Sequence, residues 1–113
     1  MAHGITAGEF RAADGVTDWH VLEDGASVSA RFATGSFAVG VDLVTAIGRL
    51  ADAANHHPDV DLRYAVVTVR LTTHDLGGLS DRDVHLAREI TAAARDLDIA
   101  AAPDPSPPGH ATR

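Results

Sequence analysis

The alternating pattern at residues 67–72 constrains the fold more than any other feature of this sequence. Val67, Val69 and Leu71 are apolar, and each is followed by a polar residue. Successive side chains of a β-strand point to opposite sides, so this period of two predicts a strand with one buried face. A sheet of such strands needs helices on that face only, and its other face stays uncovered. An uncovered sheet face favours oligomerisation.

Two longer helical patterns flank this strand in the sequence and can cover it. Ser36 is a suitable N-cap for a helix that reaches Ala54. The last helix begins with a capping box of Ser80 and Asp83 and runs to about Leu97. Apolar residues spaced by three or four predict the buried face of each helix. These faces comprise Phe37, Val41, Val44, Ile47, Ala51 and Ala54 on the first helix, and Val84, Ala87, Ile90, Ala94 and Leu97 on the last.

The remaining elements are shorter. Thr6 and Glu9 form a capping box at the start of a helix, and Asp24-Gly25 is a strong hairpin signal between two extended runs. In chain order, we expect a helix over residues 6–13, strands over 19–22 and 27–32, and a further strand over 62–64. Helical segments set between hairpins predict an α+β fold, in which helices cover one face of an antiparallel sheet.

Length and composition indicate a single domain over residues 1–102. The chain has 113 residues, and four prolines within residues 103–108 open a segment without an apolar anchor. We therefore expect residues 103–113 to form a disordered tail. No signal peptide and no membrane-spanning stretch is visible, so we expect a cytoplasmic protein with no membrane partner.

The charged and sulfur-containing residues exclude several chemistries. There is no cysteine, which rules out disulfides, a thiolate nucleophile and a zinc–thiolate site. There is no lysine either, so Schiff-base catalysis is excluded. The formal charge of −7, without a basic stripe, argues against nucleic acid as a partner. Seven histidines remain as the side chains best suited to proton exchange near neutral pH.

Two adjacent histidines stand where the first long helix ends, in the stretch "NHHPD". Pro58 disfavours the helical conformation at His57, so the chain turns extended there and both rings can face one cleft. His74 and Asp75 close the central strand, and Asp83 opens the last helix. If that strand lies beside the helix end, three histidines and one or two carboxylates converge.

Plainer interpretations stand beside this hypothesis. A histidine at a helix C-terminus often only favours the helix dipole, and Asp83 has a sufficient structural task in its capping box. A metal site is less expected, because adjacent histidines are awkward ligands for one ion and the HExxH spacing is absent. Tyr64 and Trp19 suit the core or a pocket wall. We interpret the other histidines as incidental: His3, His20, His85 and His110.

The combined motif resembles the pterin-4a-carbinolamine dehydratases. The residues that carry the resemblance are "NHHPD", then Tyr64 ten residues before His74, and "LTTHDLGGLSDRDVHLA". Weaker similarity extends from about Trp19 to Ala94. The resemblance implies a four-stranded antiparallel sheet with three helices on one face, and homodimers or homotetramers. It also implies loss of water from a 4a-hydroxytetrahydropterin to give the quinonoid dihydropterin, in support of aromatic amino acid hydroxylases, with no metal or other cofactor.

The family resemblance also implies roles for individual residues. The catalytic residues would be His56, His57 and His74, of which His56 and His74 would transfer protons and His57 would mainly hold the pterin substrate. The residues alone leave open which of the two adjacent histidines moves the proton. Asp75 would orient a histidine or contact the pterin. Asp83 would tune a neighbouring imidazole. The remaining substrate-binding candidates are Asp52, which stands where the family commonly has Glu, Pro58 and Tyr64. The alternative is a non-catalytic protein-binding or assembly-factor module on the same fold.

Overall fold

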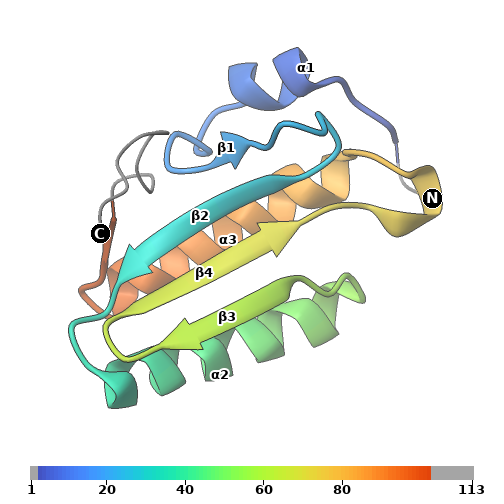
Figure 1. Ribbon diagram of the computed structural model, residues 1–113. Coiled ribbons are helices and arrows are strands. Elements are labelled where there is room, and N and C mark those ends of the chain that lie inside the picture. Colours follow the sequence, from blue (N-terminus) through green and yellow to red (C-terminus); the bar gives the residue numbers. More distant parts are fainter. Residues whose placement is uncertain (1–2, 103–113) are drawn as a thin grey trace.

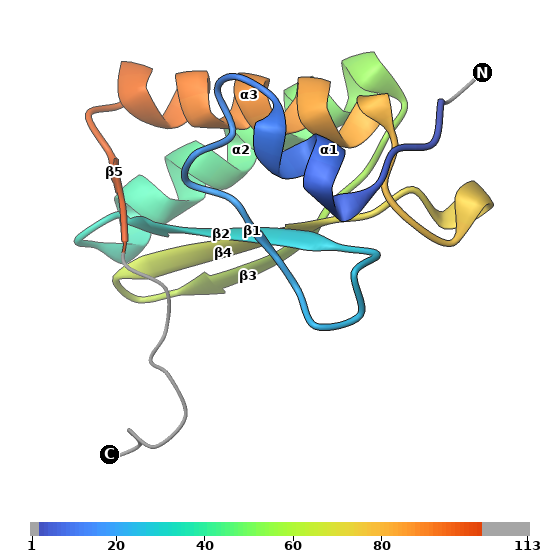
Figure 2. The same cartoon turned by 90° about the horizontal axis from the view of Figure 1, so that it is seen from above.

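An antiparallel sheet and three helices form two layers, with every helix on the same side of the sheet (Figures 1 and 2). The computed structural model describes residues 3–102, so the expected tail over residues 103–113 lies outside the described part. The predicted α+β class and helix order are confirmed. The elements are α1 (Ala7–Ala12), β1 (His20–Val21), β2 (Val28–Ala33), α2 (Phe37–Ala54), β3 (Asp59–Arg63), β4 (Val66–Leu71), the 3-10 turn η1 (His74–Leu76), α3 (Asp81–Asp96) and β5 (Ala100–Ala101).

The four predicted strands occur in the order β1-β2-β4-β3, and every pairing is antiparallel. The longest pairing joins β2 to β4, from Val28 opposite Leu71 to Ala33 opposite Val66. The structure adds a fifth strand, the two-residue β5, which pairs with the end of β2. Two alanines carry no alternation of apolar and polar residues, so this short strand has no signal in the sequence.

Alternate residues of β2 and β4 build the core, as the period of two requires. Val28 and Phe32 of β2 and Val69 of β4 are almost completely buried. They pack against one face of α2 and one face of α3. The core residues of these two helices are Leu43, Ile47 and Ala51 of α2, and Val84, Leu86, Ala87, Ile90 and Ala94 of α3.

The predicted buried face of α2 is partly wrong. Phe37 is 50 % exposed and Val41 is 42 % exposed, whereas Leu43 is fully buried. The helix is apolar over more than one face, so spacing alone does not choose between them. Gly40 allows a close approach to the sheet, since a Cβ atom there would lie 2.6 Å from Cδ1 of Leu62 in β3. The helix packs on the sheet with this glycine side inward, and Phe37 and Val41 turn outward.

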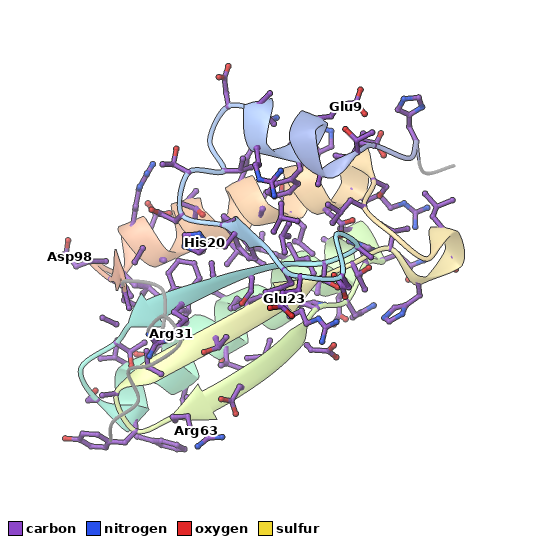
Figure 3. All side chains as sticks on the ribbon, turned by 45° about the horizontal axis from the view of Figure 1, so that its top comes forward. Glu9, His20, Glu23, Arg31, Arg63 and Asp98 are labelled. Carbon is purple, nitrogen blue, oxygen red and sulfur yellow. The ribbon has the colours of Figure 1, made fainter. Side chains whose placement is uncertain are left out.

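The sheet face without helices carries polar and charged side chains. Ser29 and Arg31 of β2 alternate with buried residues, so they point away from the helices. His20 lies opposite Ser29, and Arg63 lies opposite Val66 on the same outer face. Figure 3 shows His20, Arg31 and Arg63 on three different strands. A polar face can remain in water, which explains how this side of the sheet stays uncovered.

The N-terminal segment is tied to the loop that precedes α3. The backbone N–H of Ile5 donates to the carbonyl of Leu79 at 3.0 Å, and the N–H of Asp81 donates to the carbonyl of His3 at 3.0 Å. The Asp81 carboxylate in turn accepts from the His3 N–H at 3.0 Å. Residues 3–5 are thus bonded both to the loop before α3 and to the first residue of the helix. Between residues 3 and 102, no helix is long and apolar enough to cross a membrane.

Candidate active site

The end of α2 brings the adjacent histidines out of the helix. Asn55 adopts a left-handed conformation, with φ 50° and ψ 44°, and it is the residue after the last helical turn. Asparagine tolerates this conformation better than most residues, and it commonly ends helices in this way. Asn55 therefore makes the reversal, and Pro58 then leads the chain into β3. The sequence interpretation assigned the whole change of direction to the proline.

His56 turns inward and meets a buried carboxylate. Its Nε2 lies 2.7 Å from Oδ1 of Asp83, with His56 8 % exposed and Asp83 fully buried. The other oxygen of Asp83 accepts from the Thr73 hydroxyl at 2.8 Å and from the Ser80 N–H at 3.0 Å. Asp83 thus closes the predicted capping box of α3 and also binds His56. The predicted capping role of Asp83 is confirmed, and its role toward the His56 imidazole stays a prediction.

The partners of His56 determine where its protons lie. An ionised carboxylate only accepts hydrogen bonds, so opposite an ionised Asp83 the proton of this hydrogen bond lies on Nε2 of His56. Nδ1 of His56 has no hydrogen-bond partner within residues 3–102. Among the described residues, every fully buried side-chain nitrogen or oxygen has a hydrogen-bond partner. Since Nδ1 of His56 has none, it must keep some contact with solvent. Nδ1 is therefore the atom of His56 that is available for chemistry.

His57 turns the other way, toward solvent. It is 58 % exposed, and its Nε2 lies 2.9 Å from Oδ1 of Asp52, which is 80 % exposed. Asp52 precedes His57 by five residues on the last turns of α2, so its short side chain reaches the ring.

One pocket unites the histidines of the two segments. Its volume is about 310 Å³, at the small end of ligand-binding cavities. The end of α2, the end of β4 with η1, and the start of α3 meet there, at one end of the sheet (Figure 1). The lining residues are Asn55, His56, His57, Thr73, His74, Asp75 and Arg82. The structure therefore brings together His56, His57, His74 and Asp75, with Asp83 directly beneath and Asp52 outside His57.

The family model described as "Pterin 4 alpha carbinolamine dehydratase" matches residues 4–93 of this chain. The chain belongs to this family. Relatives that carry the name "Putative pterin-4-alpha-carbinolamine dehydratase" include one from Chloroflexus aggregans, which is 44% identical over 73 residues, or 65% of this chain and 77% of the relative. One from Nocardia farcinica is 41% identical over 78 residues, or 69% of this chain and 80% of the relative.

A solved member of the dehydratase family has the same fold. It is described as the "Crystal structure of transcriptional coactivator/pterin dehydratase from Brucella Melitensis". Its TM-score is 0.68 at 27% sequence identity, and the similarity covers 77% of this chain and 90% of that one. The pocket with three histidines therefore lies in a dehydratase-family fold.

Tyr64 and Pro58, two residues of the dehydratase-like motif, do not line this pocket. Tyr64 is 71 % exposed in the turn after β3, so the expectation that it lies in the core or a pocket wall is wrong. Asp59 starts β3 near the pocket, and five residues of strand place Tyr64 about 16 Å away, at the opposite end of the hairpin. Pro58 is half-buried and connects His57 to β3.

Trp19 and the other histidines are placed largely as expected. Trp19 is buried in the core, and its Nε1–H donates to Thr91 at 3.0 Å. His3, His20 and His85 are exposed and lie outside the pocket of the dehydratase-like motif, and His110 lies outside the described residues. Across residues 3–102, no group of three or more His, Asp or Glu side chains is arranged to hold a metal ion.

The sequence interpretation did not assign three further residues to this site. Thr73 and Ser80 supply buried hydroxyls around Asp83, and Arg82 lines the pocket from the first turn of α3. A signal for Thr73 existed, because the alternation that buries Val69 and Leu71 continues to residue 73 and points it inward. Arg82 gave no such signal, since exposed arginines are common at the start of a surface helix.

Proposed function

We propose that this chain dehydrates a 4a-hydroxytetrahydropterin to the quinonoid dihydropterin by histidine acid–base catalysis. The observation that carries the proposal is the meeting of His56, His57 and His74 at one pocket, with a buried carboxylate behind His56. Membership of the dehydratase family supports the substrate class.

The reaction needs one proton donor and one proton acceptor. The hydroxyl group on C4a receives a proton and leaves as water, which breaks the C4a–O bond. The N5–H bond loses its proton, and its electrons form the double bond between N5 and C4a. No electron is gained or lost overall, so the reaction requires acid–base groups and no redox partner. Imidazole suits both tasks near neutral pH, and such a group typically contributes about 10²–10⁴-fold to the rate.

We assign the two proton transfers to His56 and His74. His56 follows the end of α2 and His74 begins η1, so the two rings enter the pocket from different segments. His56 would act through Nδ1, while Asp83 stabilises the charged ring that forms when Nδ1 takes up a proton. His57, supported by Asp52, would hold the pterin, and Asp75 would contact the pterin or orient His74.

We further propose a homodimer or homotetramer that supports aromatic amino acid hydroxylases in the cytoplasm. Phe37 and Val41 are half-exposed on α2, and burying such side chains favours association. The uncovered sheet face is charged, so the outer side of α2 is the better candidate for the contact.

A second function, as a protein-binding module, is favoured by one specific observation. The solved relative from Brucella is described as both a transcriptional coactivator and a pterin dehydratase. The exposed apolar side of α2 would suit a protein partner, whereas the histidine pocket serves no purpose in such a module. A stoichiometric partner retained on purification, combined with absent dehydratase activity, would favour this function.

The dehydratase proposal is tested with freshly generated 4a-carbinolamine. Its decay should be faster with the wild-type protein than in buffer, and substitution His56→Ala should remove most of the acceleration. His20→Ala is the matched control, because His20 is exposed on β1 outside the pocket and its loss should leave the rate unchanged. Decay at the buffer rate with folded wild-type protein would refute the proposal.

A further inference from the structure

Two buried hydroxyls lie behind His56 and Asp83. Thr73 is 2 % exposed and Ser80 is fully buried. Thr73 Oγ1 lies 2.8 Å from Oδ2 of Asp83 and 2.6 Å from Oγ of Ser80. Ser80 Oγ also accepts from the backbone N–H of Arg82 at 3.2 Å.

The direction of this hydrogen-bond chain follows from its last member. The Asp83 carboxylate can only accept, so the Thr73 hydroxyl must donate its single proton to Oδ2. Thr73 Oγ1 then has no proton left for Ser80, and therefore accepts from the Ser80 hydroxyl. Every donor in the chain points toward Asp83, from the Arg82 N–H through Ser80 and Thr73.

This arrangement fixes the Asp83 carboxylate on one side. Oδ2 is held by the Thr73 hydroxyl and by the Ser80 N–H at 3.0 Å, so the carboxylate cannot rotate freely. Oδ1 is then directed at Nε2 of His56, at 2.7 Å. A ring held in this way keeps its proton on Nε2 and presents Nδ1 to the pocket. Which ring nitrogen carries the proton is commonly set by the hydrogen bond that the nitrogen makes.

We propose that Thr73 and Ser80 are positioning residues, which hold Asp83 so that His56 exchanges protons with the substrate through Nδ1. The effect on the rate rests on the proposed dehydratase function, whereas the position of the ring proton is a property of the free protein. Thr73 is the more informative of the two residues. The capping box of α3 uses Ser80 and Asp83 only, so helix capping gives no reason for the Thr73 hydroxyl.

The substitution Thr73→Val tests the proposal, because it removes the hydroxyl and keeps nearly the same shape. Nitrogen-15 NMR of the His56 ring, at a pH where the ring is neutral, should show the Nε2–H form in the wild type and a mixture of both forms in the variant. The turnover number kcat should fall about tenfold, a part of what an oriented acid–base group contributes, and KM should stay unchanged. Thr73→Ser keeps a hydroxyl at this position and should therefore keep both the Nε2–H form of His56 and the wild-type kcat.

Thr91→Val is the matched control. Thr91 is also buried, and its hydroxyl accepts from Trp19 Nε1, about two turns further along α3 than Asp83. Its loss should weaken the fold but leave the His56 ring and kcat as in the wild type. If Thr73→Val does not fold, Ser80→Ala removes the second hydroxyl of the hydrogen-bond chain. The His56 ring form and kcat are then measured in that variant.

The two readouts separate this proposal from the proposed function. A folded Thr73→Val variant with the wild-type Nε2–H form and the wild-type kcat would overturn the positioning role. If Thr91→Val loses the Nε2–H form and kcat as Thr73→Val does, the positioning role is also overturned, because the effect would then be one of general stability. If the wild-type protein has no dehydratase activity, the proposed function fails, and the NMR measurement still decides whether Thr73 orients His56.

Discussion

The site contains the same pair of side chains twice, once buried and once exposed. His56 lies 2.7 Å from Asp83 beneath the pocket, and His57 lies 2.9 Å from Asp52 at its rim. The inner pair is shielded from water, and Thr73 and Ser80 hold its carboxylate in place. The outer pair is open to solvent. Nearly equal distances therefore hide very different environments.

The difference between the pairs follows from solvation. An exposed pair is screened by water and salt, and its side chains pay entropy to stay together, so its net effect on stability is small. Removal of one partner from a buried pair leaves the other partner buried with an unmet hydrogen bond. Burial also fixes geometry, which suits proton transfer, whereas exposure lets the ring of His57 follow a substrate. The inner pair should therefore govern chemistry and stability, and the outer pair should govern binding.

The largest expected effect comes from removing Asp83. Asp83→Ala breaks the buried pair and the capping box together, and should lower the free energy of unfolding by about 3 kcal/mol. The rate should fall more than about 10²-fold, because His56 loses its orientation. Asp52→Ala is the matched variant at the rim, and should leave the urea unfolding midpoint unchanged. Equal midpoints for the two variants would contradict the distinction between the pairs.

A smaller effect is expected from His57→Ala. If His57 mainly holds the pterin, KM should rise about tenfold, as for the loss of a hydrogen bond to a charged group, and kcat should change little. Steady-state kinetics with a range of 4a-carbinolamine concentrations measures both constants. Asp52→Ala should give the same change in weaker form. A drop in kcat with an unchanged KM would instead place His57 among the proton-transferring groups.

The elements that could be predicted are those with local signals. Ser36 begins α2 where expected, and its end at Ala54 agrees with the predicted boundary. The capping boxes at Thr6 and Ser80 are both present. These signals lie within three or four residues of each other in the sequence, so no knowledge of the tertiary structure is needed to recognise them.

The convergence of the histidines needed more than local signals. His56 and Asp83 are 27 residues apart in the sequence, and their meeting depends on how α2 and α3 lie over the sheet. The proline after His57 and the strand that ends before His74 made a shared pocket plausible, and the family resemblance strengthened it. The depth of each side chain was beyond reach. Nothing in "HHP" says that the first histidine is buried and the second exposed.

The errors have a common physical cause, since they concern choices made by packing. The buried face of α2 depends on contacts with the sheet, such as the close approach of Gly40 to Leu62 in β3. Tyr64 was expected in the core or a pocket wall, but the antiparallel register puts it in the turn at the far end of the hairpin. Spacing along the chain does not reveal such distances unless the register is known.

The smallest expected effect on stability comes from Asp81. This residue begins α3 two positions before Asp83, but it is partly exposed whereas Asp83 is buried. Mainly the hydrogen bond from the His3 backbone N–H lowers the pKa of Asp81 below its ordinary value of 3.8, against an opposing effect of burial. A carboxyl group with a lowered pKa in the folded state stabilises the fold above its unfolded pKa. That contribution is lost as the pH falls through the folded pKa. Asp81→Ala should therefore unfold at slightly lower urea than the wild type at pH 7, and the difference should vanish at an acidic pH below the folded pKa of Asp81. Urea titrations at both pH values measure this. A difference that persists in acid would show that the uncharged Asp81 side chain still ties residues 3–5 to α3. The contrast between an exposed and a buried aspartate would then be smaller for Asp81 and Asp83 than for Asp52 and Asp83.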